Sequence, residues 1–417
     1  METYQETMGN YDKDDGCHST PANAAPRFCV PAEWEQHAAC LLLCPHNPAT
    51  FRIDRVHVQF RHIVRTIAAH EPAVVLGCAT ATQLRDYQAW ADHEDNANYS
   101  IHCVLCPSND SWARDTGPTF VVGNKHARIS SSLRALDWQF NAYGGPADGC
   151  YWPCDHDKLV AKTLTDALKR LALVPSTTGV QSVPLILEGG SIHTDGQGTL
   201  LTTAECLLHP NRNPDKTREK IEGLVLEATG CSKMIWLDHG LSGDEDTNGH
   251  VDNWACFIRP GVMVLAWTDD VQHQPDNYAR CRYSLKQLEA ETDAQGRHLI
   301  VHKLHLPSPM YYSKEEVATL SRAVPPTSEN PAVVQPREVG EVLAASYVNF
   351  YIANTAVLVP QYGDPIFDVK ALETLRPLFP DRAVIGVQSR EILLGGGNIH
   401  CITQQVPRVS PSDESDV

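Results

Sequence analysis

A short glycine-containing motif that occurs twice constrains the fold of this chain more than any other feature. Residues 188–193 read EGGSIH and residues 395–400 read GGGNIH. Similar polar interruptions occur at 112–117 (WARDTG), 248–253 (NGHVDN) and 346–349 (SYVN). Chance similarity of glycine-rich turns would explain a single matching pair. Recurrence along the whole chain instead predicts a pseudo-symmetric array whose polar strand ends point to a common centre.

The segments between these motifs have the pattern of an α/β chain, since short apolar runs alternate with segments of helical periodicity. We predict helices at 53–70 and 157–173, and a third that begins at Asn213 with a proline behind it and ends at Gly230. We predict strands at 72–78, 101–106, 119–123, 199–203, 233–237, 254–258, 262–267, 355–360 and 383–387.

No Gly/Ser-rich linker divides the chain of 417 residues, so we predict one α/β domain over residues 28–407. Flexible acidic tails are expected at 1–27 and 408–417, and their ends, residues 1–15 and 409–417, account for seven of the 17 excess negative charges. The segment 325–340 holds four prolines. We interpret it as an irregular surface loop, although long loops often carry function.

The charge balance restricts the partners of this chain. It has 51 Asp and Glu residues against 34 Lys and Arg residues, which excludes a basic surface for nucleic acid and favours cationic ligands. No apolar run is long enough to cross a bilayer, and the N-terminus lacks the basic and apolar regions of a signal peptide. We therefore expect a soluble cytoplasmic protein with no membrane partner.

The 14 cysteines allow a metal-binding alternative. Cys103 and Cys106 form a C-x-x-C pair, and three residues separate the cysteines at 40/44 and at 150/154. A zinc-containing binding protein built on these pairs is conceivable. Most of them lie in apolar runs, however, where a cysteine packs as a small core residue. Without a secretory signal most should be reduced thiols, and we predict no metal site.

Cys401 differs from the other cysteines because it follows the glycine loop 395–397 and precedes a polar TQQ segment. That setting favours a reactive thiol. The loop itself has neither the P-loop spacing nor the dinucleotide fingerprint, so nucleotide binding is not expected. If residues 249–253 form a strand, His250 and Asp252 project to the same side, as a base with its charge partner or as metal ligands.

Several carboxylates accompany the thiol, among them Asp115, Glu188 and Asp252. The simple interpretation of the neighbours Arg114 and Asp115 is a surface ion pair. So many carboxylates would raise the pKa of a thiol, which does not suit an ordinary cysteine protease. They suit a substrate that brings its own positive charge, such as a guanidinium, whose planar N–H donors pair bidentately with carboxylates.

With these residues identified, the chain resembles the guanidine-modifying enzyme superfamily and, within it, the agmatine deiminase (agmatine iminohydrolase) family. The resemblance implies a propeller of five ββαβ units around a central site, a homodimer, and no metal or organic cofactor. It runs from about residue 31 to residue 407 and rests on WARDTGP from 112, FNAYGG from 140, EGGSIH from 188, NRNP from 211, GDEDTNGHVDN from 243, SYVNF from 346 and LGGGNIHC from 394.

The resemblance also implies roles for single residues. Cys401 matches the nucleophile, His250 the general acid and base, and Glu188 the glutamate that orients the histidine. Asp115 and Asp252 match the carboxylates that bind the guanidinium and belong to the catalytic set.

At the outer part of the pocket, Trp112 and Asp246 match residues near the aliphatic chain and the amine of the substrate. Two positions depart from the family pattern: Ala113 stands where many relatives have Met, and Tyr143 where many have Trp. Both are expected at the periphery of the pocket.

The implied activity is the hydrolysis of agmatine to N-carbamoylputrescine and ammonia through a thiouronium on the cysteine, in polyamine (putrescine) biosynthesis. Deimination of arginine or of peptidyl-arginine is the alternative within the superfamily. Those substrates present a carboxylate or a peptide backbone, which calls for an arginine or amide donors at the outer pocket. The acidic run from Asp244 to Asp246 suits an amine better.

Overall fold

The structure, a computed structural model, describes residues 28–123, 132–320, 333–334 and 336–409. The two predicted tails lie almost entirely outside the described residues, and so does most of the predicted loop 325–340. The division into one domain and two tails therefore stays a prediction.

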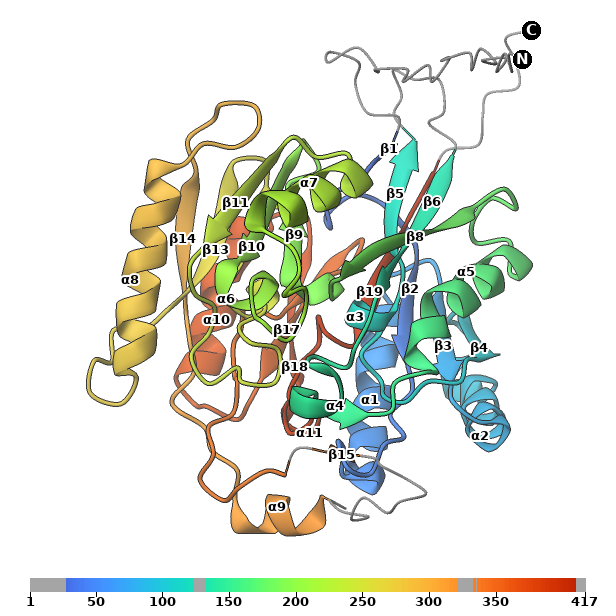
Figure 1. The fold of residues 1–417 in the computed structure, drawn as a ribbon. Helices are drawn as coiled ribbons and strands as arrows, with labels where there is room; N and C mark the ends of the chain where they lie inside the picture. Colours follow the sequence, from blue (N-terminus) through green and yellow to red (C-terminus); the bar gives the residue numbers. More distant parts are fainter. Residues whose placement is uncertain (1–27, 124–131, 321–332, 335, 410–417) are drawn as a thin grey trace, which may run out of the picture.

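Five units of the same topology make up most of the described chain (Figure 1). In each unit two antiparallel strands are followed by a helix and then by a third strand, which pairs in parallel with the second. Four units follow one another along the chain: β5 (Thr119–Gly123), β6 (Leu133–Gln139), α5 (Val160–Arg170) and β8 (Gly179–Ile186); β9 (Ile192–Thr194), β10 (Thr199–Thr203), α7 (Arg218–Thr229) and β11 (Lys233–Leu237); β12 (Ala255–Arg259), β13 (Val262–Trp267), α8 (Pro275–Ala290) and β14 (Ile300–His305); β16 (Tyr351–Ile352), β17 (Ala356–Gln361), α10 (Phe367–Leu375) and β18 (Ala383–Gln388).

The fifth unit combines the two ends of the described chain. β19 (Thr403–Pro407) pairs antiparallel with β2 (His37–Leu43), which is followed by α1 (Ile53–Ala68) and by the parallel strand β3 (Val74–Cys78). This sheet gains one more parallel strand through α2 (Ala81–Ala91) and β4 (Ile101–Leu105).

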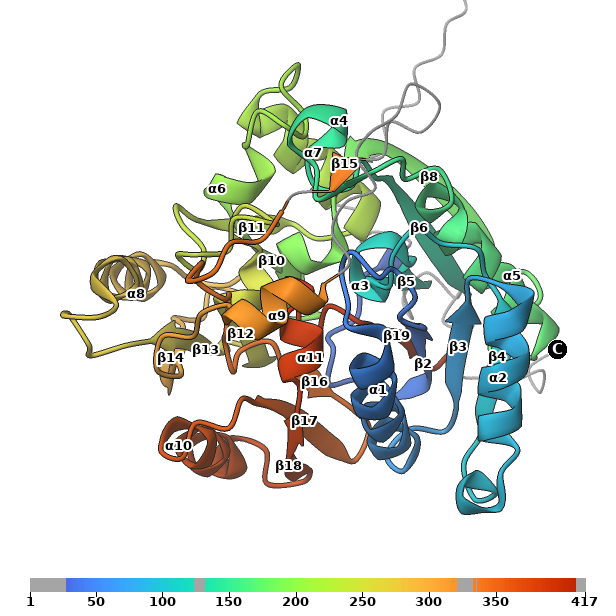
Figure 2. The ribbon, with the colours of Figure 1, turned by 90° about the horizontal axis from the view of Figure 1, so that it is seen from below.

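Seen from below, the five sheets lie around a common centre (Figure 2). The helices α2, α5, α8 and α10 lie at the periphery of this view, whereas the short helix α3 (Ala113–Thr116) lies near its centre. The predicted five-bladed α/β propeller is confirmed. The recurring motifs of the sequence are the connections between its units.

Shorter elements complete the described chain. β1 (Phe28–Cys29) pairs with β5. β7 and β15 form a separate two-stranded sheet. The bounds of the remaining short elements are β7 (Tyr151–Trp152), β15 (Val333–Val334), α4 (Gly145–Asp148), α6 (Ala204–Leu207), α9 (Lys314–Thr319), α11 (Arg390–Leu393), and the 3₁₀ turns η1 (Glu94–Asn96), η3 (Asp157–Leu159), η4 (Gly189–Ser191), η5 (Val251–Asn253) and η6 (Arg376–Leu378).

Three strands that lie between two partners, β3, β10 and β17, are buried over their whole length, because helices and neighbouring units cover both faces. This explains their continuous apolar sequences, such as VVLGC in β3. Exposed residues occur on the outer helices and also on the edge strands β8, β14 and β18. Within the described residues, none of the helices is long and apolar enough to cross a membrane.

The predicted strands are all present, with ends that differ by at most two residues. One helix boundary was wrong: α7 begins at Arg218 and not near Asn213. The side chain of Asn213 hydrogen-bonds the backbone of Ile186 at both its N–H and its carbonyl, so it ties the loop to β8. Thr217 caps the helix instead, and Gly230 ends it in the left-handed conformation, as predicted.

Candidate active site

The five connections between units bring the candidate residues together. Each connection lies directly before the first strand of a unit, so pseudo-symmetry places its polar side chains at the common centre. They supply Asp115 before β5, Glu188 before β9, His250 and Asp252 before β12, Asn349 before β16, and Cys401 before β19.

The thiol of Cys401 is 4% exposed and faces two polar side chains. Its sulfur lies 3.2 Å from Nδ2 of Asn349, which donates to it, and 3.7 Å from Oδ2 of Asp252. Its backbone carbonyl accepts the N–H of Arg114 and so joins the thiol loop to α3. The thiol therefore lies beside a carboxylate and an amide donor.

Gly190 shows how tightly the acidic and basic groups converge. A Cβ at this position would lie 2.7 Å from Nδ1 of His250, 2.8 Å from Oδ2 of Asp252 and 3.0 Å from Oδ1 of Asp115. Three titratable side chains therefore surround one point of backbone, and only glycine leaves room for them there.

His250 is fully buried between two carboxylates. Its Nε2 lies 3.6 Å from Oε2 of Glu188, and its Nδ1 lies 4.0 Å from Oδ1 of Asp115. Among the described residues, neither ring nitrogen has a hydrogen-bond partner. Glu188 is itself held by Arg212, whose Nε lies 3.1 Å from Oε2.

The two carboxylates assigned to the guanidinium have different partners. Asp115 accepts a hydrogen bond from the Tyr143 hydroxyl at 2.8 Å and one from the Gly190 N–H at 2.9 Å. Oδ2 of Asp252 accepts from Nδ1 of His400 at 2.8 Å. Its other oxygen, Oδ1, is buried without a hydrogen-bond partner in the described part of the chain. A buried acceptor without a partner is costly, so it marks a position for a donor.

The surroundings of the free site favour a protonated thiol and a charged imidazole. Burial, followed by the charges of Asp252 and Asp115, raises the pKa of the Cys401 thiol well above its usual value. Burial opposes the charge on His250, but the acidic groups of Cys206 and Asp115 hold its pKa well above the usual value. A positive ligand would favour the thiolate.

The two carboxylates beside His250 have very different pKa values. Burial raises the pKa of Asp115 to about 6 despite the charge of His250. Burial also opposes ionisation of Glu188, but the guanidinium of Arg212 and then His250 lower its pKa to about 2. Glu188 is thus a fixed negative charge, whereas Asp115 titrates in a range that ligand binding can shift.

A pocket of about 500 Å³ leads from the surface to Cys401. Its wall includes Asp115 and Tyr143 near the thiol, and the indole of Trp112, which packs against Phe51 with ring centroids 5.4 Å apart. Glycines of the 395–397 loop leave room for this indole, since a Cβ at Gly397 would lie 2.5 Å from it. The predicted place of Trp112, beside an aliphatic chain, is compatible with this wall.

The outer end of the pocket holds an ion pair that the sequence did not predict. Arg337 donates through both terminal nitrogens to the carboxylate of Asp246, and its Nη1 also lies 3.4 Å from Oε1 of Glu341. Both Arg337 and Asp246 line the pocket. The interpretation of 325–340 as surface decoration is therefore wrong for Arg337, which reaches the site. Residues 336 and 338–340 of the segment do not line this pocket.

Comparison with known proteins agrees with this geometry. The model of the Porphyromonas-type peptidyl-arginine deiminase family matches residues 29–407. The chain belongs to this family. It is 43% identical over 390 residues to an agmatine deiminase of Ectopseudomonas mendocina, a match that covers 93% of this chain and 98% of that one.

Other deiminases of agmatine are similar over nearly their whole length. An agmatine deiminase of Medicago truncatula is 42% identical over 388 residues, covering 92% of this chain and 97% of that one. The solved structure of the agmatine deiminase of Enterococcus faecalis matches with a TM-score of 0.76 at 35% identity, covering 92% and 97% of the two chains. The family resemblance seen in the sequence is confirmed.

Two local expectations for this deiminase-family chain were wrong. His250 and Asp252 do not lie in a strand, because Asp252 belongs to the 3₁₀ turn η5 and His250 precedes it. Their proximity comes from that turn. Arg114 and Asp115 do not form a surface ion pair: both are buried, and Arg114 pairs with Glu33 at 3.0 Å.

The structure adds residues that sequence reasoning did not single out. Asn349 and Arg212 stood within the quoted family strings, so the resemblance gave a signal for them without a role. Tyr143 was expected at the periphery of the pocket, which was wrong, because its buried hydroxyl donates to Asp115. For Arg337, the only feature of the sequence that indicated a function was its position in a long loop. His400 stood in the repeated motif, where its echo is His193.

The sulfur of Cys44 lies 3.7 Å from that of Cys78, but the cysteine pairs considered for zinc complete no group of three ligands among the described residues. Within the described residues, two groups have ligand atoms within 4.8 Å of one another: Glu33 with His193 and His400, and Glu188 with Cys206 and His250. Cys103 and Cys106 belong to neither group. A zinc-binding protein built on these pairs thus gains no support from their geometry.

Proposed function

We propose that this chain hydrolyses agmatine to N-carbamoylputrescine and ammonia, with Cys401 as the nucleophile. The observation that carries the proposal is the position of the Cys401 thiol, 3.7 Å from the Asp252 carboxylate and in one pocket with Asp115. The names of the similar proteins support agmatine as the substrate. The product is a precursor of putrescine, so we assign the reaction to polyamine biosynthesis.

Binding of the guanidinium activates the thiol. Asp115 and Asp252 hold the planar cation through its N–H donors, so that its carbon faces the sulfur. The added positive charge opposes the two carboxylates that keep the pKa of Cys401 high, and the thiol releases its proton to solvent. Asn349 donates to the sulfur and stabilises the thiolate.

The chemistry then has two stages. In the first, a sulfur–carbon bond forms, His250 gives its proton to the departing nitrogen, the carbon–nitrogen bond breaks, and ammonia leaves a thiouronium on Cys401. In the second, neutral His250 takes one proton from water as a carbon–oxygen bond forms and the carbon–sulfur bond breaks; the remaining hydroxyl proton passes to the departing thiolate, which gives the neutral ureido product and restores the thiol. Glu188 orients the imidazole throughout and favours its charged form.

Deimination of arginine remains a second candidate because Arg337 lines the pocket, where it could bind a carboxylate. Its guanidinium is already paired with Asp246 and lies near Glu341, so these three groups together carry one negative charge. That balance favours the amine of agmatine over the carboxylate of arginine.

Steady-state rates on agmatine, free arginine and a blocked arginine peptide test the assignment. We expect the highest kcat/KM for agmatine, with release of a ureido product and ammonia in equal amounts. A higher kcat/KM for arginine or for the peptide would contradict the proposal. We also propose a homodimer in the cytoplasm, on the family resemblance alone; light scattering of the purified chain tests the dimer.

A further inference from the structure

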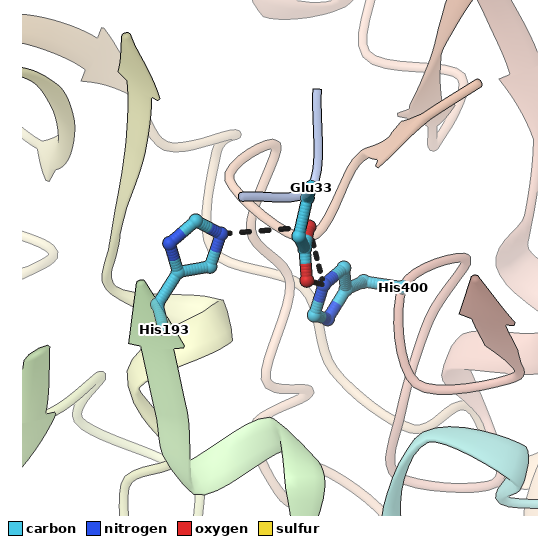
Figure 3. A group of neighbouring side chains, drawn as sticks. All are labelled: Glu33, His193 and His400. Carbon is cyan, nitrogen blue, oxygen red and sulfur yellow. Dashed lines mark hydrogen bonds and ion pairs between the residues drawn. The ribbon is translucent and has the colours of Figure 1, made fainter. Parts of the chain in front are cut away.

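Glu33, His193 and His400 form a buried cluster (Figure 3). It lies next to Asp252, whose Oδ2 is 2.8 Å from Nδ1 of His400. Both imidazoles point their Nε2 atoms at the Glu33 carboxylate, His400 at 2.9 Å and His193 at 3.4 Å. The two histidines occupy the same place in the repeated motif, in two different units. None of the three has a part in the reaction as described above.

The hydrogen bonds show that the two imidazoles carry different charge. Nδ1 of His193 accepts the backbone N–H of Phe257 at 3.2 Å, so this ring is neutral and has its proton on Nε2. His400 faces a carboxylate at both nitrogens, Asp252 at 2.8 Å and Glu33 at 2.9 Å. Carboxylates only accept, so both nitrogens of His400 carry protons and the ring is an imidazolium.

The same contacts argue against a metal ion at this cluster. The proton on Nε2 of His193 occupies the lone pair that a ligand would need. Nη1 of Arg114 donates to Oε1 of Glu33 at 3.0 Å, which places a second positive charge where a cation would bind. The cluster is therefore a network of charged hydrogen bonds.

We propose that His400, fixed by Glu33, is a positioning residue that keeps Asp252 ionised and turned toward the substrate. This inference rests on the proposed function. His400 occupies Oδ2 of Asp252 and leaves Oδ1, a buried oxygen without a partner among the described residues, to accept an N–H of the guanidinium. Positive and negative groups then alternate along a row that runs from Arg114 through Glu33, His400 and Asp252 to the substrate cation.

The pKa shifts of Asp252 and His400 agree with this alternation of charge. Burial opposes ionisation of Asp252, but His400 holds its pKa below the usual value. Burial and Arg114 lower the pKa of His400, yet Glu33 and Asp252 raise it above the usual value. Among the described residues, the titratable and charged groups that face His400 or Asp252 include Glu33, Arg114, Asp115, His193, His250, Cys256 and Cys401.

Matched variants test the kinetic consequence. In His400→Asn we expect kcat/KM for agmatine at pH 7 to fall about 10- to 100-fold, because Asp252 loses a charged hydrogen bond. The acidic limb of the pH profile should acquire a second ionisation and move to higher pH, so that activity partly recovers as the pH rises. His193→Asn, the equivalent change in the neutral ring, should keep the wild-type pH profile. Identical profiles for both variants would overturn the proposal.

A second measurement does not depend on turnover. In the wild type labelled with ¹⁵N-histidine, NMR should show His400 doubly protonated from pH 5 to pH 8. The signal of His400 is assigned by its loss in His400→Asn or by its change of chemical shift in Glu33→Gln. Titration of that ring near its ordinary pKa would overturn the inference even if agmatine is hydrolysed. If the wild type does not hydrolyse agmatine while His400 stays charged, the proposed function fails and the charge assignment survives.

Discussion

Arg337 forms a two-pronged ion pair with Asp246 at the outer end of the pocket that leads to Cys401. The paired groups are mostly buried, with side chains 11% and 16% exposed. Asp246 is the carboxylate expected near the amine of agmatine. In the free protein, the guanidinium of Arg337 therefore occupies the carboxylate that the substrate amine would use.

Removal of Arg337 should strengthen agmatine binding. In Arg337→Met we expect KM to fall about 3- to 10-fold, because the amine no longer competes for Asp246 and meets one positive charge fewer. Asp246→Asn should raise KM by a similar factor. In both variants kcat should change little, since the pair lies away from the thiol.

Steady-state kinetics on agmatine measures these effects. Arg55→Met is the matched control, because Arg55 pairs with Glu315 on an exposed surface and should leave KM unchanged. A higher KM in Arg337→Met would contradict the competition and would show that Arg337 supports the pocket wall.

A methyl group at Gly190 should disable the site and leave the fold intact. In Gly190→Ala the new Cβ would push apart His250, Asp252 and Asp115, and we expect kcat/KM to fall by about 100-fold. Gly223→Ala is the control: that glycine lies inside α7, where a Cβ meets nothing within 4 Å. The control should retain activity and gain about 0.5–1 kcal/mol in the free energy of unfolding. Normal activity in Gly190→Ala would contradict the convergence of these groups.

The hydroxyl of Tyr143 should set the acidic limit of activity. Asp115 must be ionised to hold a guanidinium, and its pKa is about 6, so kcat/KM should fall below pH 6. A bound cation favours the ionised form of Asp115, so the acidic limb of kcat should lie at lower pH than the acidic limb of kcat/KM. In Tyr143→Phe the carboxylate loses a donor at 2.8 Å. Its pKa should rise and the limb of kcat/KM should move up by about one pH unit.

Tyr151→Phe is the control for this pH profile. Tyr151 also lines the pocket, but its hydroxyl donates to Asp157, which does not. Its removal should leave the acidic limb in place. Equal profiles for the two variants would show that Asp115 does not control the limb.

The buried pair of Glu188 and Arg212 should contribute strongly to stability. Arg212→Met leaves Glu188 buried without its charge partner, which should cost about 3–5 kcal/mol in urea unfolding at pH 7. Because the pKa of Glu188 is lowered to about 2 from 4.5, its contribution is fully present above pH 4.5 and is lost as the pH falls toward 2. Arg297→Met, which breaks a more exposed pair with Asp293, should cost about 1 kcal/mol or less. Equal costs would contradict the role of burial.

The repeated motifs predicted a pseudo-symmetric array, the family resemblance implied the α/β propeller, and buried strands such as β3 were visible as apolar runs. The helix α8 was not predicted, because it is mostly polar and buries only Cys281, Ser284 and Leu288. The start of α7 depended on which polar residue capped it, and Asn213 was already bound to β8.

The candidate residues could be predicted because each lies in a repeated connection. Their partners could not, since these come from distant parts of the chain. Glu33 reaches His400 across 367 positions, and Arg337 reaches Asp246 across 91. Periodicity describes local structure and contains no information on such pairings.

The central claim is that the Cys401 sulfur forms a covalent bond to the guanidine carbon. Rapid acid quench during turnover of agmatine, followed by mass spectrometry of the digested chain, measures this bond directly. We expect an added mass equal to agmatine minus ammonia on the peptide that contains Cys401, and neither adduct nor turnover in Cys401→Ser. An adduct on another cysteine, or turnover that persists in Cys401→Ser, would contradict the claim.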